Sequence, residues 1–193
     1  MKYSELAVID KREHVLASGN VLQFVWRWVK GVGGKGTLQI TLPSHAHKQL
    51  CDMCKSIETI SGIPFSVSNL VSFQLQELIK KQEMEQNVFA LKKAFVKIED
   101  ATSIVQKGKR NAKVLISLPK NQIYSVECIL FNMEEELGQH NYKVEKVIQL
   151  LLTDVLRQIA MGKMQKVVES LLLELGVERK EIKEYVSKKE ILI

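Results

Sequence analysis

The chain has 193 residues, of which 46% are apolar and 26% charged, and its formal net charge is +6. This balance supports a folded core and excludes a wholly disordered chain; a membrane-spanning helix is also excluded, because no run of about 18 apolar residues occurs. Three sparsely placed cysteines argue against a disulfide scaffold and favour a cytoplasmic protein.

Residues 1–35 form an N-terminal segment with an ambiguous pattern. Leu22, Phe24, Trp26 and Trp28 alternate as in a strand, but the same run also fits a buried helix. The glycine-rich end of this segment contains Lys35 and invites comparison with a phosphate-binding loop. It lacks the required residue order, because a glycine follows the lysine. We interpret it as a basic arm leading into the next element.

Residues 37–43 (TLQITLP) return as residues 113–119 (KVLISLP). Each copy alternates along the chain and ends in Leu-Pro, which predicts a short strand terminated by proline. One short strand cannot satisfy its own hydrogen bonds, so we expect the two to pair as a ribbon. One face is apolar, with Leu38, Ile40, Leu42, Val114, Ile116 and Leu118. The other face carries Thr37, Gln39, Thr41, Lys113, Leu115 and Ser117.

Two helical patterns separated by a glycine follow each strand. The first helix of each copy has a matching apolar stripe, formed by Leu50, Met53, Cys54 and Ile57 and by Val126, Ile129, Leu130 and Met133. Gly62 and Gly138 suit left-handed C-terminal caps. The predicted N-terminal caps are Ser44 and Asn121 for the first helices, and Ser66 or Ser68 and Asn141 for the second helices.

Between and after the copies, further helices are predicted. Residues 80–100 keep an apolar spacing typical of a connecting helix, with Met84, Val88, Leu91, Phe95 and Ile98. A basic loop with Lys109 and Arg110 then leads into the second strand. After Gly162 we expect an amphipathic helix that ends at Gly176, and a short charged helix over residues 178–189.

The positive charge is unevenly distributed. No acidic residue lies between Glu13 and Asp52, or between Asp100 and Glu127, and these two windows contain both predicted strands. This pattern predicts a basic face centred on the ribbon, which is the footprint expected of a protein that binds a polyanion.

The unit of strand, Leu-Pro, helix, glycine and helix resembles the ribbon–helix–helix family of DNA-binding proteins (Arc, MetJ and CopG types). Tandem copies in one chain look like the TraY-type accessory proteins of conjugative relaxosomes. The resemblance implies a mainly α protein with a short two-stranded antiparallel β-ribbon, divided into two units (36–80 and 111–160), a helical linker with a basic loop (81–110), the N-terminal segment and C-terminal helices (161–193). It implies binding of double-stranded DNA by a ribbon in the major groove.

By position, the resemblance gives each side chain an expected role. The base-reading residues would be Thr37, Gln39, Thr41, Lys113, Leu115 and Ser117, with Leu115 either contacting a thymine methyl group or reading less than its partners. The phosphate-contacting residues would be Lys35, Ser66, Ser68, Asn69, Lys109, Arg110, Asn141 and Lys143. The expected role is a transcriptional regulator or a plasmid transfer or maintenance factor, with self-association through the C-terminal helices as a further expectation.

Other functions have weaker support. His45, His47, Cys51 and Cys54 are zinc-ligand types, but their spacing is compressed and Cys54 matches the apolar Leu130 of the second copy, which favours a core position. No catalytic arrangement stands out, so we expect neither an enzyme nor a cofactor. The main alternative is a helical protein–protein adaptor that uses Trp26, Trp28 and the C-terminal helices and does not bind DNA.

Overall fold

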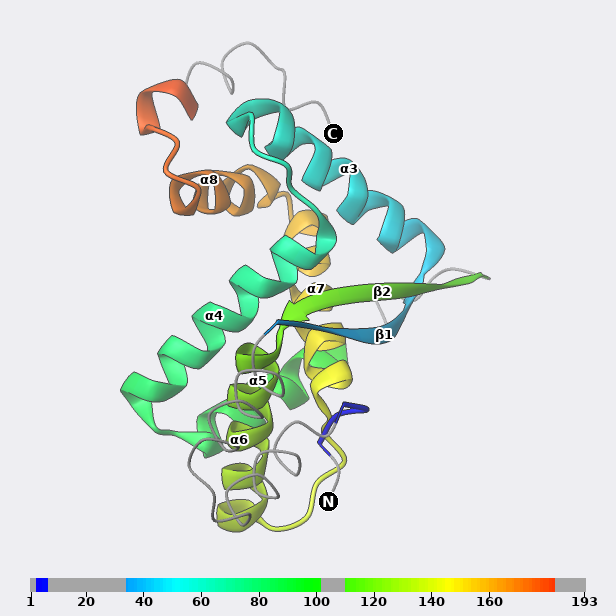
Figure 1. The fold of residues 1–193 in the computed structure, drawn as a ribbon, viewed down its shortest axis with the longest axis vertical. Coiled ribbons are helices and arrows are strands. Elements are labelled where there is room, and N and C mark those ends of the chain that lie inside the picture. Colours follow the sequence, from blue (N-terminus) through cyan, green and yellow to red (C-terminus); the bar gives the residue numbers. More distant parts are fainter. Residues whose placement is uncertain (1–2, 7–33, 102–109, 183–193) are drawn as a thin grey trace.

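The part of the chain that the structure describes is mainly helical with one two-stranded antiparallel sheet, as predicted (Figure 1). The computed structural model describes residues 3–6, 34–101 and 110–182. Their elements are, in chain order, β1 (Lys35–Pro43), α3 (Ser44–Ser61), α4 (Val67–Glu85), α5 (Val88–Ala101), β2 (Asn111–Pro119), α6 (Lys120–Leu137), α7 (Val144–Ala160) and α8 (Met164–Glu174). Among the helices of these residues, none is long and apolar enough to cross a membrane.

The two strands pair antiparallel over their whole length, and we call the pair the ribbon. Thr37 lies opposite Ser117, Gln39 opposite Leu115, and Thr41 opposite Lys113. Both strands begin two residues earlier than predicted, at Lys35 and Asn111. The predicted apolar face is confirmed, because all six of its side chains are buried in the core: Leu38, Ile40, Leu42, Val114, Ile116 and Leu118.

Each strand is bordered by a helix from the other copy. Helix α4, which follows the first strand, contacts β2, and helix α7, which follows the second strand, contacts β1. Ser117 N–H of β2 donates to Ser68 Oγ of α4 at 3.0 Å, and Gln149 Nε2 of α7 donates to the Thr41 carbonyl of β1 at 3.0 Å. The two copies therefore cross over and share one core.

The predicted apolar stripes of α3 and α6 are buried throughout, including Cys54 and its counterpart Leu130. Helix ends were less predictable. Both first helices begin directly after Pro43 and Pro119 without a side-chain cap, so the predicted caps Ser44 and Asn121 are wrong. The first N–H of each helix instead donates to a backbone carbonyl just before the other strand: Ser44 N–H to the Arg110 carbonyl at 2.9 Å, and Lys120 N–H to the Gly34 carbonyl at 3.0 Å.

The glycines after these helices differ. Gly62 has φ 67° and ψ 6°, the predicted left-handed cap, and its N–H donates to the Glu58 carbonyl at 2.9 Å. Gly138 has φ 76° but ψ −178°, which is not the left-handed helical conformation. This segment leads instead to His140, whose ring Nε2 lies 2.9 Å from the Leu130 carbonyl.

The linker between the copies is not one helix from residue 80. Helix α4 continues to Glu85, and α5 starts at Val88 after a turn at Gln86, which has φ 45°. The Asn87 side chain accepts a hydrogen bond from the Ala90 N–H at 2.8 Å and so caps α5. Val88, Leu91 and Phe95 are buried as predicted, but Met84 is 86% exposed because it belongs to the end of α4.

Helix α8 lies after Gly162, as predicted, and ends before Gly176. Val167, Val168 and Leu171 are buried, and α8 contacts α3 and α7. Its apolar stripe is therefore used inside the chain. Most of the predicted terminal helix, residues 183–189, lies outside the described residues.

Residues 3–6 are fastened to the second copy. The Val144 N–H donates to the Tyr3 carbonyl at 2.8 Å, and the Glu5 N–H donates to Glu145 Oε1 at 2.7 Å. The Ser4 hydroxyl donates to the buried Glu127. Trp26 and Trp28, with nearly all of the N-terminal segment, lie outside the described residues.

Candidate nucleic-acid interface

The outward face of the ribbon brings together the six residues predicted to read bases. Thr37, Gln39 and Thr41 are exposed, and so are Lys113 and Leu115 on the paired strand; Ser117 is half-buried. Leu115 is 66% exposed, so an apolar side chain stands in the open among polar ones. We call these six side chains the polar face, although Leu115 departs from its polarity.

The hydrogen bonds to the flanking helices define how these residues pair. Ser117 N–H and the Thr41 carbonyl point away from the partner strand, because each is bonded to a helix outside the ribbon. The pairs Thr37–Ser117 and Thr41–Lys113 are therefore of the non-hydrogen-bonded type. The two types alternate along antiparallel strands, so Gln39–Leu115 belongs to the same type, in which facing side chains are closest.

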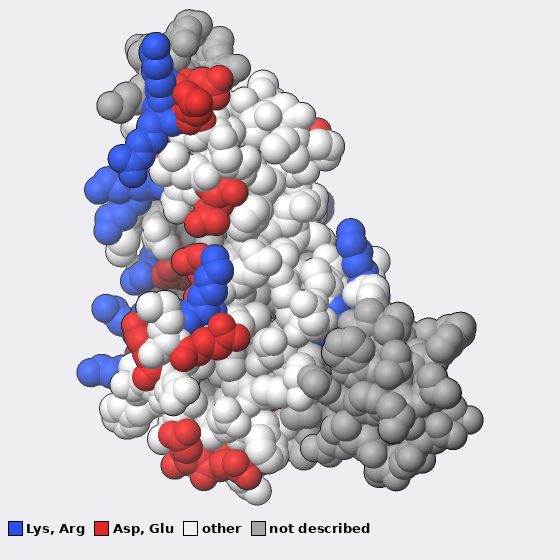
Figure 2. Space-filling view, turned by 60° about the vertical axis from the view of Figure 1, so that its left-hand side comes forward, with Lys and Arg blue, Asp and Glu red and all other residues white. Residues whose placement is uncertain are grey.

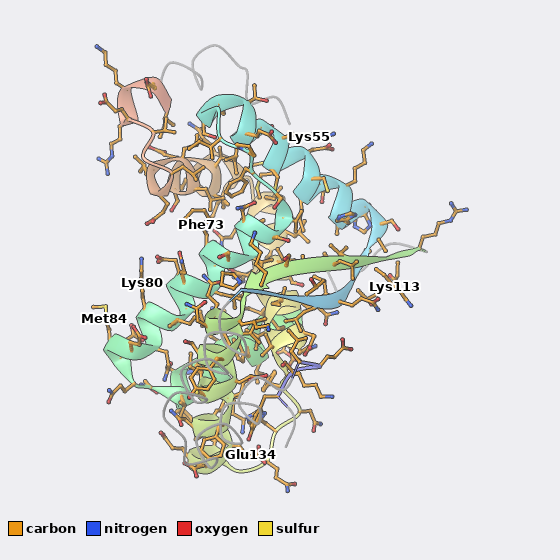
Figure 3. The ribbon with its side chains drawn as sticks, in the orientation of Figure 1. Lys55, Phe73, Lys80, Met84, Lys113 and Glu134 are labelled. Carbon is orange, nitrogen blue, oxygen red and sulfur yellow. The ribbon has the colours of Figure 1, made fainter. Side chains whose placement is uncertain are left out.

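Positive groups and helix starts without acidic residues accompany the polar face. Lys35, Arg110 and Lys113 are exposed, and Lys113 projects from the ribbon (Figure 3). The strands contain no acidic residue, and none lies in the first turns of α3, α4 and α6. The predicted Lys109 lies outside the described residues.

Basic residues are not confined to the ribbon. Figure 2 shows one side of the molecule, where Lys and Arg gather along one edge with acidic side chains among them, next to a broad area without charges. What distinguishes the ribbon is thus that its strands carry no acidic residue, and not that it has more lysines than the rest of the surface.

At the start of α4, two of the predicted phosphate residues form a cap. The Asn69 N–H donates to Ser66 Oγ at 3.3 Å, and the Ser66 N–H donates to Asn69 Oδ1 at 3.0 Å. Ser66 is therefore the N-terminal cap of α4, one of the two residues predicted for this role. The side chains of Ser66 and Asn69 are both exposed. Ser68 is different: its hydroxyl accepts the bond from β2, so the structure gives it a role in joining α4 to the ribbon.

The start of α7 is not equivalent to the start of α4. Its N-terminal cap is Lys143 without a side-chain bond, so the predicted cap Asn141 is wrong. A cavity of about 590 Å³ at this site is lined by Glu99 and Glu145 as well as by Asn141 and Lys143. Glu145 lies in the first turn of α7, whereas the first turn of α4 has no acidic residue, so the two helix starts differ in charge.

The cavity beside α7 is also lined by Tyr142, a tyrosine with a raised pKa. Tyr142 Oη donates to Glu99 Oε2 at 3.0 Å, and Lys146 Nζ lies 2.9 Å from Glu99 Oε1. Burial raises the pKa of Tyr142 to about 12, and the bond to Glu99 adds to the effect. Glu99 is thus engaged by two neighbours, a phenol and an ammonium group, at this end of α7.

The histidine and cysteine pattern does not assemble into a metal centre. Among the described residues, no group of three potential ligands comes together. His47 Nε2 lies 3.4 Å from Cys51 Sγ on one helix face, while Cys54 points into the core. Burial, with a smaller effect of Cys51, raises the pKa of Cys54 to about 12, so this thiol stays protonated at neutral pH.

Sequence reasoning missed the contacts between copies. Gln149 was not predicted to touch the ribbon, and Ser68 was assigned to phosphate; a signal for either would have required knowing that the helices cross over. Leu6 is a third case, because a Cβ on Gly36 would lie 2.5 Å from Leu6 Cδ1. Gly36 therefore leaves room for the N-terminal residues at the start of β1.

No family model, curated protein or solved structure matches this chain.

Proposed function

We propose that this chain binds double-stranded DNA sequence-specifically, with the ribbon in the major groove, and acts as a transcriptional regulator or a plasmid transfer or maintenance factor in the cytoplasm. The observation that carries the proposal is the polar face. Its side chains come from two strands, five of the six are exposed, and one apolar core lies behind them. A two-stranded ribbon of this kind fits the major groove of DNA.

The crossed packing supports the finer proposal of a tandem ribbon–helix–helix protein. In such a fold two units interlock, so that the second helix of each unit borders the strand of the other. The contacts of α4 with β2 and of α7 with β1 agree with that arrangement. The matched burial of the two copies agrees with it too.

Binding would have an electrostatic and a base-reading part. Lys35, Arg110 and Lys113 neutralise phosphates and release counterions, which makes affinity depend on salt. Gln39 can bond adenine with its amide, Lys113 can donate to guanine, and the threonine hydroxyls can serve either base. The capped start of α4 would approach one phosphate, whereas Glu145 in the first turn of α7 disfavours the same contact there.

A gel-shift assay on random duplex DNA over a salt series tests the electrostatic part. We expect the logarithm of the binding constant to fall linearly with the logarithm of salt concentration, with a slope of about −0.9 for each phosphate contacted. Lys113→Ala should make this slope less negative by about 1. Lys166→Ala, which removes an exposed lysine of α8, is the matched control and should leave the slope unchanged.

Selection from a random-sequence library then tests the base-reading part. We expect enrichment of an asymmetric site, because the two strands carry different side chains on the polar face. A strict palindrome bound by two separate chains would contradict a single chain acting as the complete reader.

The adaptor alternative is favoured by a different surface. Phe89 is 67% exposed and Met84 86% exposed, and Met84 lies at the end of α4 away from the ribbon (Figure 3). A groove of about 490 Å³ lies beside them, lined by α4 and α6 residues including Tyr124 and Cys128. A protein that acted only as an adaptor would show no salt-dependent binding in the same gel shift.

A further inference from the structure

The centre of the polar face is the place where the two copies differ most in chemistry. Gln39 and Leu115 occupy the same position in the two repeats, and they also lie opposite each other in the ribbon. The approximate twofold axis that relates the copies therefore passes between them. In a ribbon made of two identical chains, identical residues would meet at this point.

The two side chains at this centre are accessible and adjacent. Leu115 is 66% exposed and Gln39 is exposed, and they form a non-hydrogen-bonded pair, whose Cβ atoms are typically about 4.5–5.5 Å apart. Around them, on the same face, are hydroxyl and ammonium groups. An amide and an isobutyl group thus stand side by side at the middle of the surface.

This combination matches one base pair in the major groove. Adenine presents N7 and the N6 amino group, which an amide can bond with both of its atoms, and thymine presents a C5 methyl group, which an apolar side chain can cover. Guanine and cytosine offer Leu115 no methyl group. Neighbouring strands are about 4.8 Å apart, whereas base pairs are spaced by about 3.4 Å, so the two side chains reach one base pair or two adjacent ones.

We infer that Leu115 is a thymine-methyl contact and that, with Gln39, it requires A·T at the centre of the bound site. This inference rests on the proposed DNA binding and adds the identity of the central bases. It assigns Leu115 a positive role in specificity rather than a gap in the reading surface.

The test compares the selected duplex synthesised with thymidine and with deoxyuridine, which lacks only the C5 methyl group. The native chain should bind the uracil duplex about fourfold more weakly for each methyl group that Leu115 covers, the factor expected for one buried methyl group. Leu115→Ala, which shortens the side chain, should lose the part of this difference that comes from methyl groups covered by Leu115.

Leu173→Ala is the matched control, since Leu173 is an exposed leucine of α8, outside the ribbon. It should keep the full uracil effect of the native chain. Single uracil substitutions should then locate the sensitive thymine, and 7-deazaadenine, which lacks N7, should weaken binding at the same or the next base pair only when Gln39 is present.

Equal binding of both duplexes by the native chain would overturn the inference while leaving DNA binding intact. An undiminished uracil effect in Leu115→Ala would also overturn it, because the methyl group would then act through another residue or through DNA shape. Failure to bind any duplex would overturn the proposed function, and this inference with it.

Discussion

Replacing Ser68 by alanine tests how much the hydrogen bond between α4 and β2 contributes to stability. The substitution removes the oxygen that accepts the Ser117 N–H of β2 at 3.0 Å. Both residues are half-buried, and the N–H points between β2 and α4, so water has limited access to it. The amide would then lack its partner in the folded state.

The expected loss follows from two opposing contributions. A buried amide without a partner costs about 1–3 kcal/mol. Alanine forms helices more readily than serine, which offsets roughly 0.5 kcal/mol. We therefore expect Ser68→Ala to lower the free energy of unfolding by about 0.5–2.5 kcal/mol. For a chain of this size, each 1 kcal/mol corresponds to a Tm lower by about 2–4 °C.

Urea unfolding gives the stability, and amide hydrogen exchange at Ser117 reports on the bond itself. The control is Ser56→Ala in α3, because the Ser56 hydroxyl only donates to the carbonyl of Asp52 in the same helix, at 3.1 Å. That variant should be neutral or slightly more stable. Equal effects of the two substitutions, with unchanged exchange at Ser117, would refute the docking of α4 on β2.

Four further outcomes are expected. Gln39→Ala should weaken binding to the selected DNA site by about 1–3 kcal/mol and hardly change binding to random DNA; equal losses on both would exclude Gln39 as a base reader. Cys54 should resist thiol reagents at pH 8 in the native protein and react only after unfolding, so rapid native labelling, located by mass spectrometry, would contradict its burial. Burial raises the pKa of Cys54 and of Tyr142 to about 12, so both groups stay protonated to a higher pH in the folded state than in the unfolded state. The stability that they contribute should be present below about pH 9 and be lost progressively from there to pH 12, which urea unfolding at each pH would measure. Gly36→Ala should destabilise the fold by crowding Leu6, and Leu6→Ala should relieve part of that loss, so strictly additive effects would contradict the contact.

The periodic parts of the fold were predictable from the sequence. The alternation of apolar residues identified both strands and their buried faces, because every second side chain of a strand points to the same face. The repeat identified the matching helices, because apolar residues spaced three and four apart lie on one helix face. The polar face follows directly from this, since the side chains that alternate with the buried ones must point outward.

Features that depend on contacts between distant segments were not predictable. The turn at Gln86 splits the predicted linker helix although neither glycine nor proline marks it. Asn141 resembles a cap by type, but the Tyr3 carbonyl fixes the start of α7 by accepting the Val144 N–H. Local rules describe one segment at a time, and these ends are set by another segment.

The pairing of β1 with β2 within a single chain also determines how stability and folding depend on protein concentration. A ribbon built from two chains loses stability on dilution, because its formation is a bimolecular step. Here the ribbon forms within one molecule, and its stability should be the same at nanomolar and micromolar concentration. To form the ribbon, the folding chain must close the long loop that contains α3, α4 and α5. We therefore expect the rate of refolding to be limited by this closure and to be independent of protein concentration.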